Sequence, residues 1–148
     1  MFAGEFRCKL DDKGRFFIPS SIRELFDNGK PNESKSVIFV RGQTECLWLY
    51  SLADWEQKLN HAKDMLDTDQ SRLFMHFIVS ETTASEIDRS GRICVPRRVR
   101  ELAGIEDEIV VIGMYDRMEI WSIEEWNSYL ARMEEKYETS LNKILNVL

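Results

Sequence analysis

The sequence predicts a mixed α+β protein with a mainly β core, in which two tandem repeats form one barrel with flanking amphipathic helices. Three observations support this prediction. The motif Asp-x-x-Gly-Arg occurs twice, at residues 11–15 and at residues 88–92. The residues around the two motifs match in register. Each half also combines short segments of strand periodicity with a final segment of helical periodicity.

The repeat covers most of each half of the 148-residue chain. Residues 10–25 align with residues 87–102 at an offset of 77 positions, and Asp, Gly, Arg, Pro, Arg, Glu and Leu recur in step. After a loop that is six residues longer in the first copy, the match resumes at an offset of 71, where Trp55 aligns with Trp126. Each copy is therefore a complete folding unit.

Each copy begins with a strand and a turn. Over residues 2–10, Phe, Gly, Phe, Cys and Leu alternate with Ala and charged residues, which is the period-2 pattern of a half-buried strand. The motif predicts a tight turn, because its aspartate can accept backbone N–H groups and Gly14 or Gly91 can supply a positive φ. A short apolar strand follows at residues 16–18 or 93–95, and a proline ends its pairing.

A short helix comes next in each copy. Residues 21–24 have capping-box spacing, and Pro96 suits the first turn of the second helix. Two further strands then precede a longer helix. The strands are expected at residues 37–40, 46–50, 109–112 and 118–121. The longer helices are expected over residues 52–66 and 123–137, where apolar residues follow 3,4,3,4 spacing.

Neither copy, at roughly 50 residues, buries enough surface to fold comfortably alone, so the two are expected to intertwine around one core. Trp55 and Trp126 lie on the helical stripes, where core packing is favoured over base stacking. Residues 67–81, between the copies, indicate another amphipathic helix. The apolar positions of the last helix continue to Leu148, which fits either an oligomer contact or packing on the barrel.

The composition is that of a globular protein, because 43% of the residues are hydrophobic and the net charge is only −6. No apolar run approaches the roughly 18 residues of a membrane span, and the first residues lack signal-peptide order, so a cytosolic protein is expected. Cys8, Cys46 and Cys94 are odd in number and far apart in strand-like stretches, which predicts buried, reduced thiols. His61 and His76 have no cysteine or carboxylate at ligand spacing, which disfavours a metal site.

The distribution of charge favours nucleic acid as a partner, although the net charge argues against it. Residues 7–23 carry five basic and two acidic side chains, and residues 88–100 carry five basic and one acidic side chain. These two windows together have a charge of +7, so the remaining residues carry −13. Positive charge is therefore concentrated at the motifs, and the acidic remainder is expected to steer DNA toward one face.

The motif has two interpretations. In the structural one, Arg15 and Arg92 pair back onto the motif aspartates as surface ion pairs, worth about 0–1 kcal/mol each. In the functional one, the aspartate fixes the turn while the arginine reaches a DNA groove or phosphate, where a guanidinium makes bidentate contacts. The two interpretations are compatible, and the residues alone leave both open.

Other charged residues near the motifs have different expected roles. Arg23 and Arg100 share one repeat position and each precedes a glutamate, which suggests pairing within the chain. Arg97 and Arg98 have serines at the equivalent positions of the first copy, so the two halves are expected to bind unequally. Adjacent acids in the first motif point in different directions, and no histidine or phosphate-binding loop completes a catalytic site, so the chain is not expected to be an enzyme.

Several of these motifs form one recognisable pattern. They are Met1-Phe2-x-Gly4, Asp11-x-Lys13-Gly14-Arg15 with Pro19, and Asp88-x-x-Gly91-Arg92 with Pro96 and Arg100. The pattern resembles the MraZ family of bacterial transcriptional regulators, which have two SpoVT/AbrB-like halves, and it covers nearly the whole chain. On this resemblance, residues 5–54 form the first SpoVT/AbrB-like repeat, residues 82–126 form the second, and residues 127–148 form a C-terminal helical tail.

The resemblance implies a double swapped-hairpin (AbrB-like) fold and a ring-shaped homo-oligomer in the cytoplasm, associated with the nucleoid. Such a protein binds short direct repeats in double-stranded promoter DNA upstream of the division and cell-wall gene cluster, including its own promoter, typically as a repressor. Neither a cofactor, a membrane nor a small-molecule substrate is expected. The alternative is an AbrB-like protein-interaction module without DNA binding, whose basic turns dock on acidic peptide.

In this family the Asp-x-x-x-Arg turn reads DNA, and the role transfers to the matching positions of this sequence. The residues expected to build the turns are Asp11, Gly14, Asp88 and Gly91. The residues expected to bind DNA are Arg15, Lys13, Arg92, Arg89, Arg7 and Lys9. Ser90 replaces the lysine of the first motif, so the first turn is expected to be the stronger reader.

Overall fold

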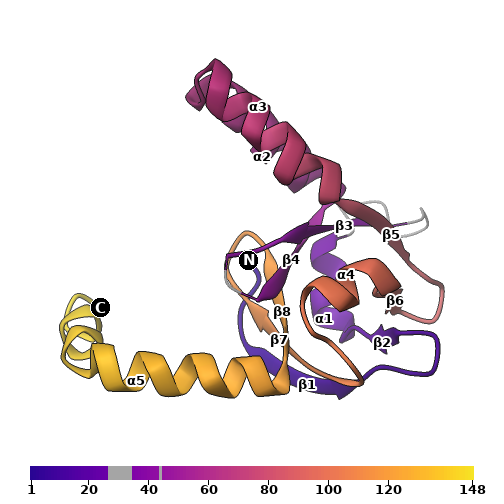
Figure 1. Cartoon of the computed structure of the whole chain (residues 1–148). Coiled ribbons are helices and arrows are strands. Elements are labelled where there is room, and N and C mark those ends of the chain that lie inside the picture. Colours follow the sequence, from indigo (N-terminus) through magenta and orange to yellow (C-terminus); the bar gives the residue numbers. More distant parts are fainter. Residues whose placement is uncertain (27–34, 44) are drawn as a thin grey trace.

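The computed structural model describes residues 1–26, 35–43 and 45–148, and in it each half of the chain contributes strands to one sheet (Figure 1). The strands of the first half are β1 (Glu5–Lys9), β2 (Arg15–Phe17), β3 (Lys35–Arg41) and β4 (Cys46–Ser51). Those of the second half are β5 (Thr83–Ile87), β6 (Arg92–Cys94), β7 (Glu108–Gly113) and β8 (Met118–Ser122). The predicted strands are therefore all present. The first is shorter than expected, since Gly4 has a φ of +88° and interrupts it.

The helices also follow the predicted order. They are α1 (Ser20–Arg23), the 3₁₀ turn η1 (Glu24–Phe26), α2 (Leu52–Met65), α3 (Thr68–Phe77), the 3₁₀ turn η2 (Val79–Glu81), α4 (Arg97–Leu102) and α5 (Ile123–Leu145). None of the described helices is long and apolar enough to span a membrane.

The two repeats exchange strands. The sheet order is β1-β7-β8-β4-β3-β5-β6-β2, and the pairs β1–β7, β3–β5, β4–β8 and β2–β6 each join one half of the chain to the other. Strands β1 and β2 lie at the two ends of this order but are separated only by the first motif turn, so the sheet curls into a nearly closed barrel. The prediction that the copies intertwine is confirmed.

One hydrophobic core fills the barrel and draws on both halves. Its largest fully buried side chains include Phe16, Phe39, Leu47, Leu49, Ile93, Ile109, Met118 and Ile120. Because these residues alternate along their strands with outward-facing ones, the period-2 pattern of the sequence directly determines which face is inside.

Helices cover parts of the outer face. Trp55 of α2 is 7% exposed and packs on Tyr50 of β4, with the two rings tilted and their centroids 5.4 Å apart. At the start of α5, Trp126 packs at 5.3 Å from Trp121 of β8. These contacts confirm that the tryptophans of the helical stripes serve packing.

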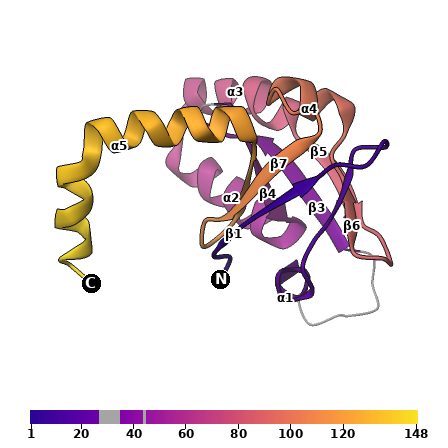
Figure 2. The ribbon, with the colours of Figure 1, turned by 90° about the horizontal axis from the view of Figure 1, so that it is seen from below.

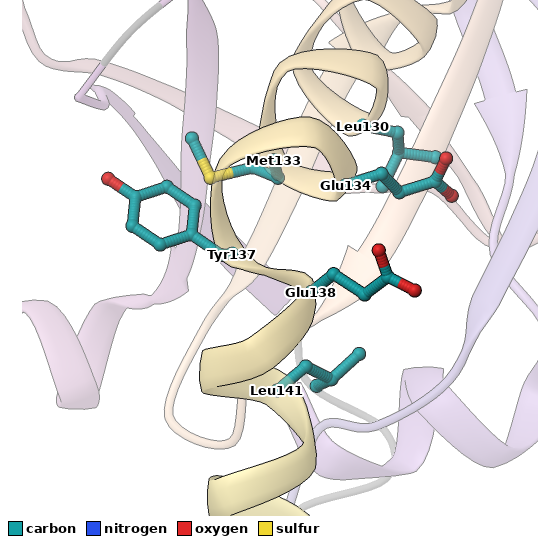
Figure 3. A pocket seen from close by; sticks show the side chains of 6 residues that line it. All are labelled: Leu130, Met133, Glu134, Tyr137, Glu138 and Leu141. Atoms are coloured by element: carbon teal, nitrogen blue, oxygen red, sulfur yellow. The ribbon is translucent and has the colours of Figure 1, made fainter.

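The rest of α5 leaves the barrel. Figures 1 and 2 show the helix extending outward and bending, with the C-terminus at its far end. Leu141 is 55% exposed, Ile144 61% and Leu148 99%, so packing of these residues on the barrel is ruled out. The bend leaves a groove of about 510 Å³ that is lined by residues of this one helix (Figure 3). They are Leu130, Met133, Glu134, Tyr137, Glu138 and Leu141.

Two local predictions were wrong. The capping box at residues 21–24 does not form, because α1 begins directly after Pro19 and has no side-chain cap. Pro96 likewise occupies the cap position of α4 rather than its first turn. A capping box does occur where none was predicted, at α3, between Asp67 and Gln70.

The cysteine prediction was right about chemistry and partly wrong about burial. All three are thiols rather than disulfides, but only Cys46 is buried, while Cys8 and Cys94 are half-buried. Partial burial raises the pKa of the Cys8 thiol to about 11, so this group stays protonated at neutral pH. Cys94 is half-buried because it lies on the outward face of the short β2–β6 pair.

Candidate nucleic-acid interface

The first motif forms a turn organised by the Asp11 carboxylate. Its Oδ1 accepts hydrogen bonds from the backbone N–H groups of Lys13, at 2.9 Å, and Arg15, at 2.8 Å. The Gly14 N–H donates to the Asp11 carbonyl oxygen at 3.0 Å, and Gly14 has a φ of +77°. Aspartate and glycine therefore play the parts that the motif chemistry predicts for them.

The same carboxylate also orients the motif arginine. Nε of Arg15 donates to Oδ2 of Asp11 at 2.7 Å, and the Arg15 side chain is 27% exposed. Since Nε is used in this contact, the two terminal Nη nitrogens of the guanidinium are left for another partner. The ion pair thus exists, as the structural interpretation expects, and it holds the arginine in one orientation.

The second motif repeats this arrangement. Oδ1 of Asp88 accepts from the backbone N–H groups of Ser90 and Arg92, each at 2.9 Å. Nε of Arg92 donates to Oδ2 of Asp88 at 2.9 Å, and Gly91 has a φ of +83°. The replacement of lysine by Ser90 leaves the turn unchanged, so it alters only the charge carried by the turn.

These hydrogen bonds lower the pKa values of Asp11 and Asp88 below the ordinary 3.8, with the backbone N–H of the motif arginine as the largest favourable cause and its side chain next. A lowered pKa means that the charged carboxylate is favoured in the folded state. The stabilisation that each charged carboxylate gives to the folded state is therefore fully present above the ordinary pKa of 3.8. It is lost as the pH falls through the lowered pKa of the folded state.

We expect an NMR titration of the carboxyl carbons to give both aspartates pKa values below 3.8. Arg15→Ala should raise the pKa of Asp11 and leave that of Asp88 unchanged, because Arg15 donates to Asp11 whereas Asp88 accepts from Arg92. Arg92→Ala is the matched control and should do the reverse. Equal shifts at both aspartates in either variant would contradict two independent turns.

The pair β2–β6 places both motif arginines on one surface. In its antiparallel register, Phe16 lies opposite Ile93, and these two side chains face the core. The outward face therefore carries Arg15, Phe17 and Arg92, with Cys94 completing the set. Arg15 lies opposite Cys94, two positions from Arg92, so the two arginines are diagonal neighbours whose Cα atoms are roughly 7–8 Å apart.

The other predicted DNA-binding residues surround this face less closely. Lys13 and Arg89 are exposed on the two turns, and neither is ion-paired to another of the described residues. Arg7 and Lys9 lie on β1, outside the β2–β6 pair, where they contact Glu5 at 3.5 Å and Glu108 at 3.7 Å. The DNA-binding roles of these four residues, like those of Arg15 and Arg92, stay predictions.

The structure also shows a crossed arrangement of the two repeats. The N–H of Ile18 donates to the carbonyl of Gly91, and that of Val95 donates to the carbonyl of Gly14, both at 2.9 Å. The residue that follows β2 or β6 is thus hydrogen-bonded to the motif turn of the other repeat. This exchange follows from strand swapping and brings the two turns to opposite ends of the β2–β6 pair.

Two arginines complete the crossed arrangement. The guanidinium carbon of Arg100, on α4, lies 2.8 Å from the position that a Cβ on Gly14 would take. The Arg23 guanidinium lies in the same way over Gly91. In Figure 2, α4 lies on the side of the first turn and α1 on the side of the second.

The predicted pairing of Arg23 and Arg100 with their neighbouring glutamates is therefore wrong. Within the described residues it is Arg97 that contacts Glu101, at 3.0 Å, while Arg100 covers the turn of the other repeat. Arg100 and Glu101 are adjacent in sequence, which suggests a local ion pair. Strand swapping instead brings the first motif turn, which is distant in sequence, next to Arg100. The sequence does contain a signal for this contact, because the motif glycine and the helix arginine both recur at the same positions of each copy.

Comparison with known proteins agrees with the motifs. Residues 1–77 and 78–145 each match the family described as "MraZ protein, putative antitoxin-like". A protein of Halothermothrix orenii named Transcriptional regulator MraZ is 37% identical over 142 residues, covering 93% of this chain and 92% of the relative. A protein of the same name from Desulforamulus reducens is 35% identical over 149 residues and covers 100% of both chains. With two full-length relatives and a family match to each half, the chain belongs to the MraZ family.

Proposed function

We propose that this protein is a DNA-binding transcriptional regulator that reads double-stranded promoter DNA with the outward face of β2–β6 and the two motif turns. The observation that carries the proposal is the shared orientation of Arg15 and Arg92, each held through Nε by an aspartate on one exposed face. The name of the relatives, Transcriptional regulator MraZ, supports regulation rather than catalysis.

The geometry suits a DNA groove. A two-stranded β-ribbon fits the major groove of B-DNA, and β2–β6 is such a pair at the end of the sheet. A guanidinium fixed through Nε presents both Nη groups together, which matches O6 and N7 of guanine or two phosphate oxygens. Because the aspartates already fix these side chains, less rotamer freedom is lost on binding.

The charge pattern supports the same face. The motif windows carry +7 in a chain whose net charge is −6, so the rest of the protein repels the phosphate backbone while the motifs attract it. Lys13 and Arg89 lie on the turns that flank the ribbon, where they suit phosphate contacts that fix its position on the duplex.

Assembly and target site belong to the same proposal. The protein forms a ring-shaped homo-oligomer, in which the exposed apolar stripe of α5 contributes a contact between copies, and it acts in the cytoplasm at the nucleoid. The ring binds direct repeats upstream of the division and cell-wall gene cluster as a repressor. Rotary symmetry suits repeats in one direction, and linked weak contacts give high avidity. Measuring the mass in solution with and without promoter DNA tests the assembly.

Substitution of Arg15 by alanine tests the DNA contact. In a mobility-shift titration on the promoter duplex upstream of its own gene, Arg15→Ala should weaken binding by about 1–3 kcal/mol, or roughly 5- to 150-fold. Lys13→Ala should weaken binding to all DNA sequences alike, since Lys13 is expected to contact phosphate. It should also reduce the salt slope, which is the slope of log affinity against log salt concentration, by about 1.

Arg72→Ala serves as the control, because this exposed arginine lies on α3, away from the β2–β6 ribbon (Figure 1). It removes the same charge and should change affinity far less than Arg15→Ala. If Arg15→Ala keeps both the affinity and the salt slope of the unmodified protein, the ribbon is not the reader. Binding of a protein partner with no binding of the duplex would favour the interaction-module alternative.

A further inference from the structure

Phe17 is an exposed aromatic ring within the proposed DNA-binding face. It is 63% exposed, whereas its neighbour Phe16 is 2% exposed and faces the core. Phe17 lies opposite Arg92 in the β2–β6 register, and the guanidinium carbon of Arg92 is 5.9 Å from the centroid of its ring. A single exposed apolar side chain is common on protein surfaces. This one differs because it neighbours both arginines held by the motif aspartates, lying opposite Arg92 and two residues from Arg15 on the same strand.

The equivalent position in the second repeat carries a different side chain. The 77-residue offset that relates Arg15 to Arg92 also relates Phe17 to Cys94. Cys94 is half-buried, and its Sγ lies 3.5 Å from the carbonyl oxygen of Lys13, to which it donates a weak hydrogen bond. The face is therefore symmetric in its arginines and asymmetric in its apolar group, with a large ring at one end only.

The chemistry of the major groove offers one apolar partner for such a ring. Its floor consists of hydrogen-bond donors and acceptors, with the C5-methyl of thymine as the apolar exception, and phenylalanine is among the side chains that contact it. A ring beside an arginine that is oriented toward the groove would meet the base pair next to the one the arginine contacts. Cys94, which is smaller and half-buried, projects less apolar surface from the ribbon.

We propose that Phe17 is a specificity-determining residue that contacts the C5-methyl group of a thymine adjacent to the base pair contacted by Arg92. Cys94 makes no equivalent contact, so the β2–β6 ribbon reads its site in one direction only. This inference rests on the proposed function, since it needs the ribbon to lie in the major groove.

Replacement of thymine by deoxyuridine is the direct test, because it removes only the methyl group. The probe is the promoter duplex upstream of the protein's own gene, with each thymine replaced in turn, and the readout is affinity by fluorescence anisotropy. The unmodified protein should lose roughly fourfold in affinity at one thymine in each binding site, which corresponds to one buried methyl group. Phe17→Ala should bind the thymine duplex more weakly and become indifferent to replacement at that position.

Two further variants and a stability check complete the design. Phe17→Leu retains apolar surface and should keep part of the preference for thymine, while Cys94→Ala should keep all of it. Phe17→Ala should melt at the temperature of the unmodified protein, because the ring is exposed and contributes little to the core.

The outcomes separate this inference from the function on which it rests. If the unmodified protein binds no promoter duplex, the proposed function fails, and the role of Phe17 fails with it. If Arg15→Ala abolishes binding while Phe17→Ala keeps the full preference for thymine, DNA reading stands and the role of Phe17 is wrong. If Phe17→Ala changes the mass of the protein in solution and not its preference, the ring belongs to a contact between copies, which also overturns the inference.

Discussion

Phe16→Ala is expected to lower the free energy of unfolding by about 3–5 kcal/mol, which is the range for removing a buried phenylalanine. Phe16 is 2% exposed and lies opposite Ile93, which is 0% exposed, so its ring is enclosed by residues from both repeats. Alanine would leave a cavity that the short β2–β6 pair cannot close without losing its register. Urea denaturation followed by circular dichroism measures the loss, and an unchanged m-value would show that the unfolded state is unaffected.

Phe17→Ala is the matched control for this prediction. The two residues are the same type on the same strand, but Phe17 is 63% exposed, so its removal should change stability by no more than about 0.5 kcal/mol. Equal losses for the two variants would mean that β2 does not present one face to the core and the other to solvent. The pair therefore tests the orientation on which the position of Arg15 depends.

Much of the fold could be predicted from the sequence because the signals are local. The alternation along β1 and the 3,4,3,4 spacing of α2 and α5 depend on the periods of strand and helix alone. The turns depend on Asp11 and Gly14, whose chemistry acts within five residues. The repeat then indicated how neighbouring units share a core, because each is too small to fold alone.

The contacts between repeats could not be predicted in the same way. Arg100 packs on Gly14 across 86 positions of sequence, and only the swapped order of strands brings them together. Local reasoning instead favoured the adjacent glutamate. The exposure of Phe17 could not be predicted for a related reason. Residues 16–18 are all apolar, so their sequence does not reveal which of them faces out.

The orientation of the last helix was open for a different reason. An apolar stripe predicts a partner surface but does not say whether that surface belongs to the same chain. The stripe begins on the barrel, at Trp126, and continues over residues that are exposed beyond it, including Leu141 and Ile144. Periodicity was thus sufficient to predict the helix and insufficient to predict what covers its outer half.

Gly14→Ala is expected to cost about 1–3 kcal/mol of stability, because an alanine there must adopt the left-handed φ of +77°. A Cβ at this position would also lie 2.8 Å from the Arg100 guanidinium carbon, so that side chain has to move. DNA affinity should fall at least as far as in Arg15→Ala, since the turn positions both Arg15 and Lys13. Thermal denaturation and the promoter mobility shift measure the two effects.

Gly104→Ala separates backbone strain from the contact with arginine. Gly104 has a φ of +62°, yet nothing lies within 4 Å of the position of its Cβ. It should therefore show the cost of the left-handed conformation alone. The excess loss in Gly14→Ala then measures the close approach of the new Cβ to the Arg100 guanidinium and to the Val95 carbonyl oxygen, which lies 3.1 Å from it. If the two variants lose equal stability, Arg100 does not support the turn.

The crossed arrangement predicts which second substitution relieves each clash. Arg100→Ala should restore part of the stability lost in Gly14→Ala and none of that lost in Gly91→Ala, because the latter meets Arg23. Arg23→Ala should show the opposite preference. Coupling within a repeat, between Arg23 and Gly14 or between Arg100 and Gly91, would contradict the arrangement. With coupling across repeats, each motif turn depends on the short helix of the other half. Neither half of the chain therefore holds its own motif turn in place unaided.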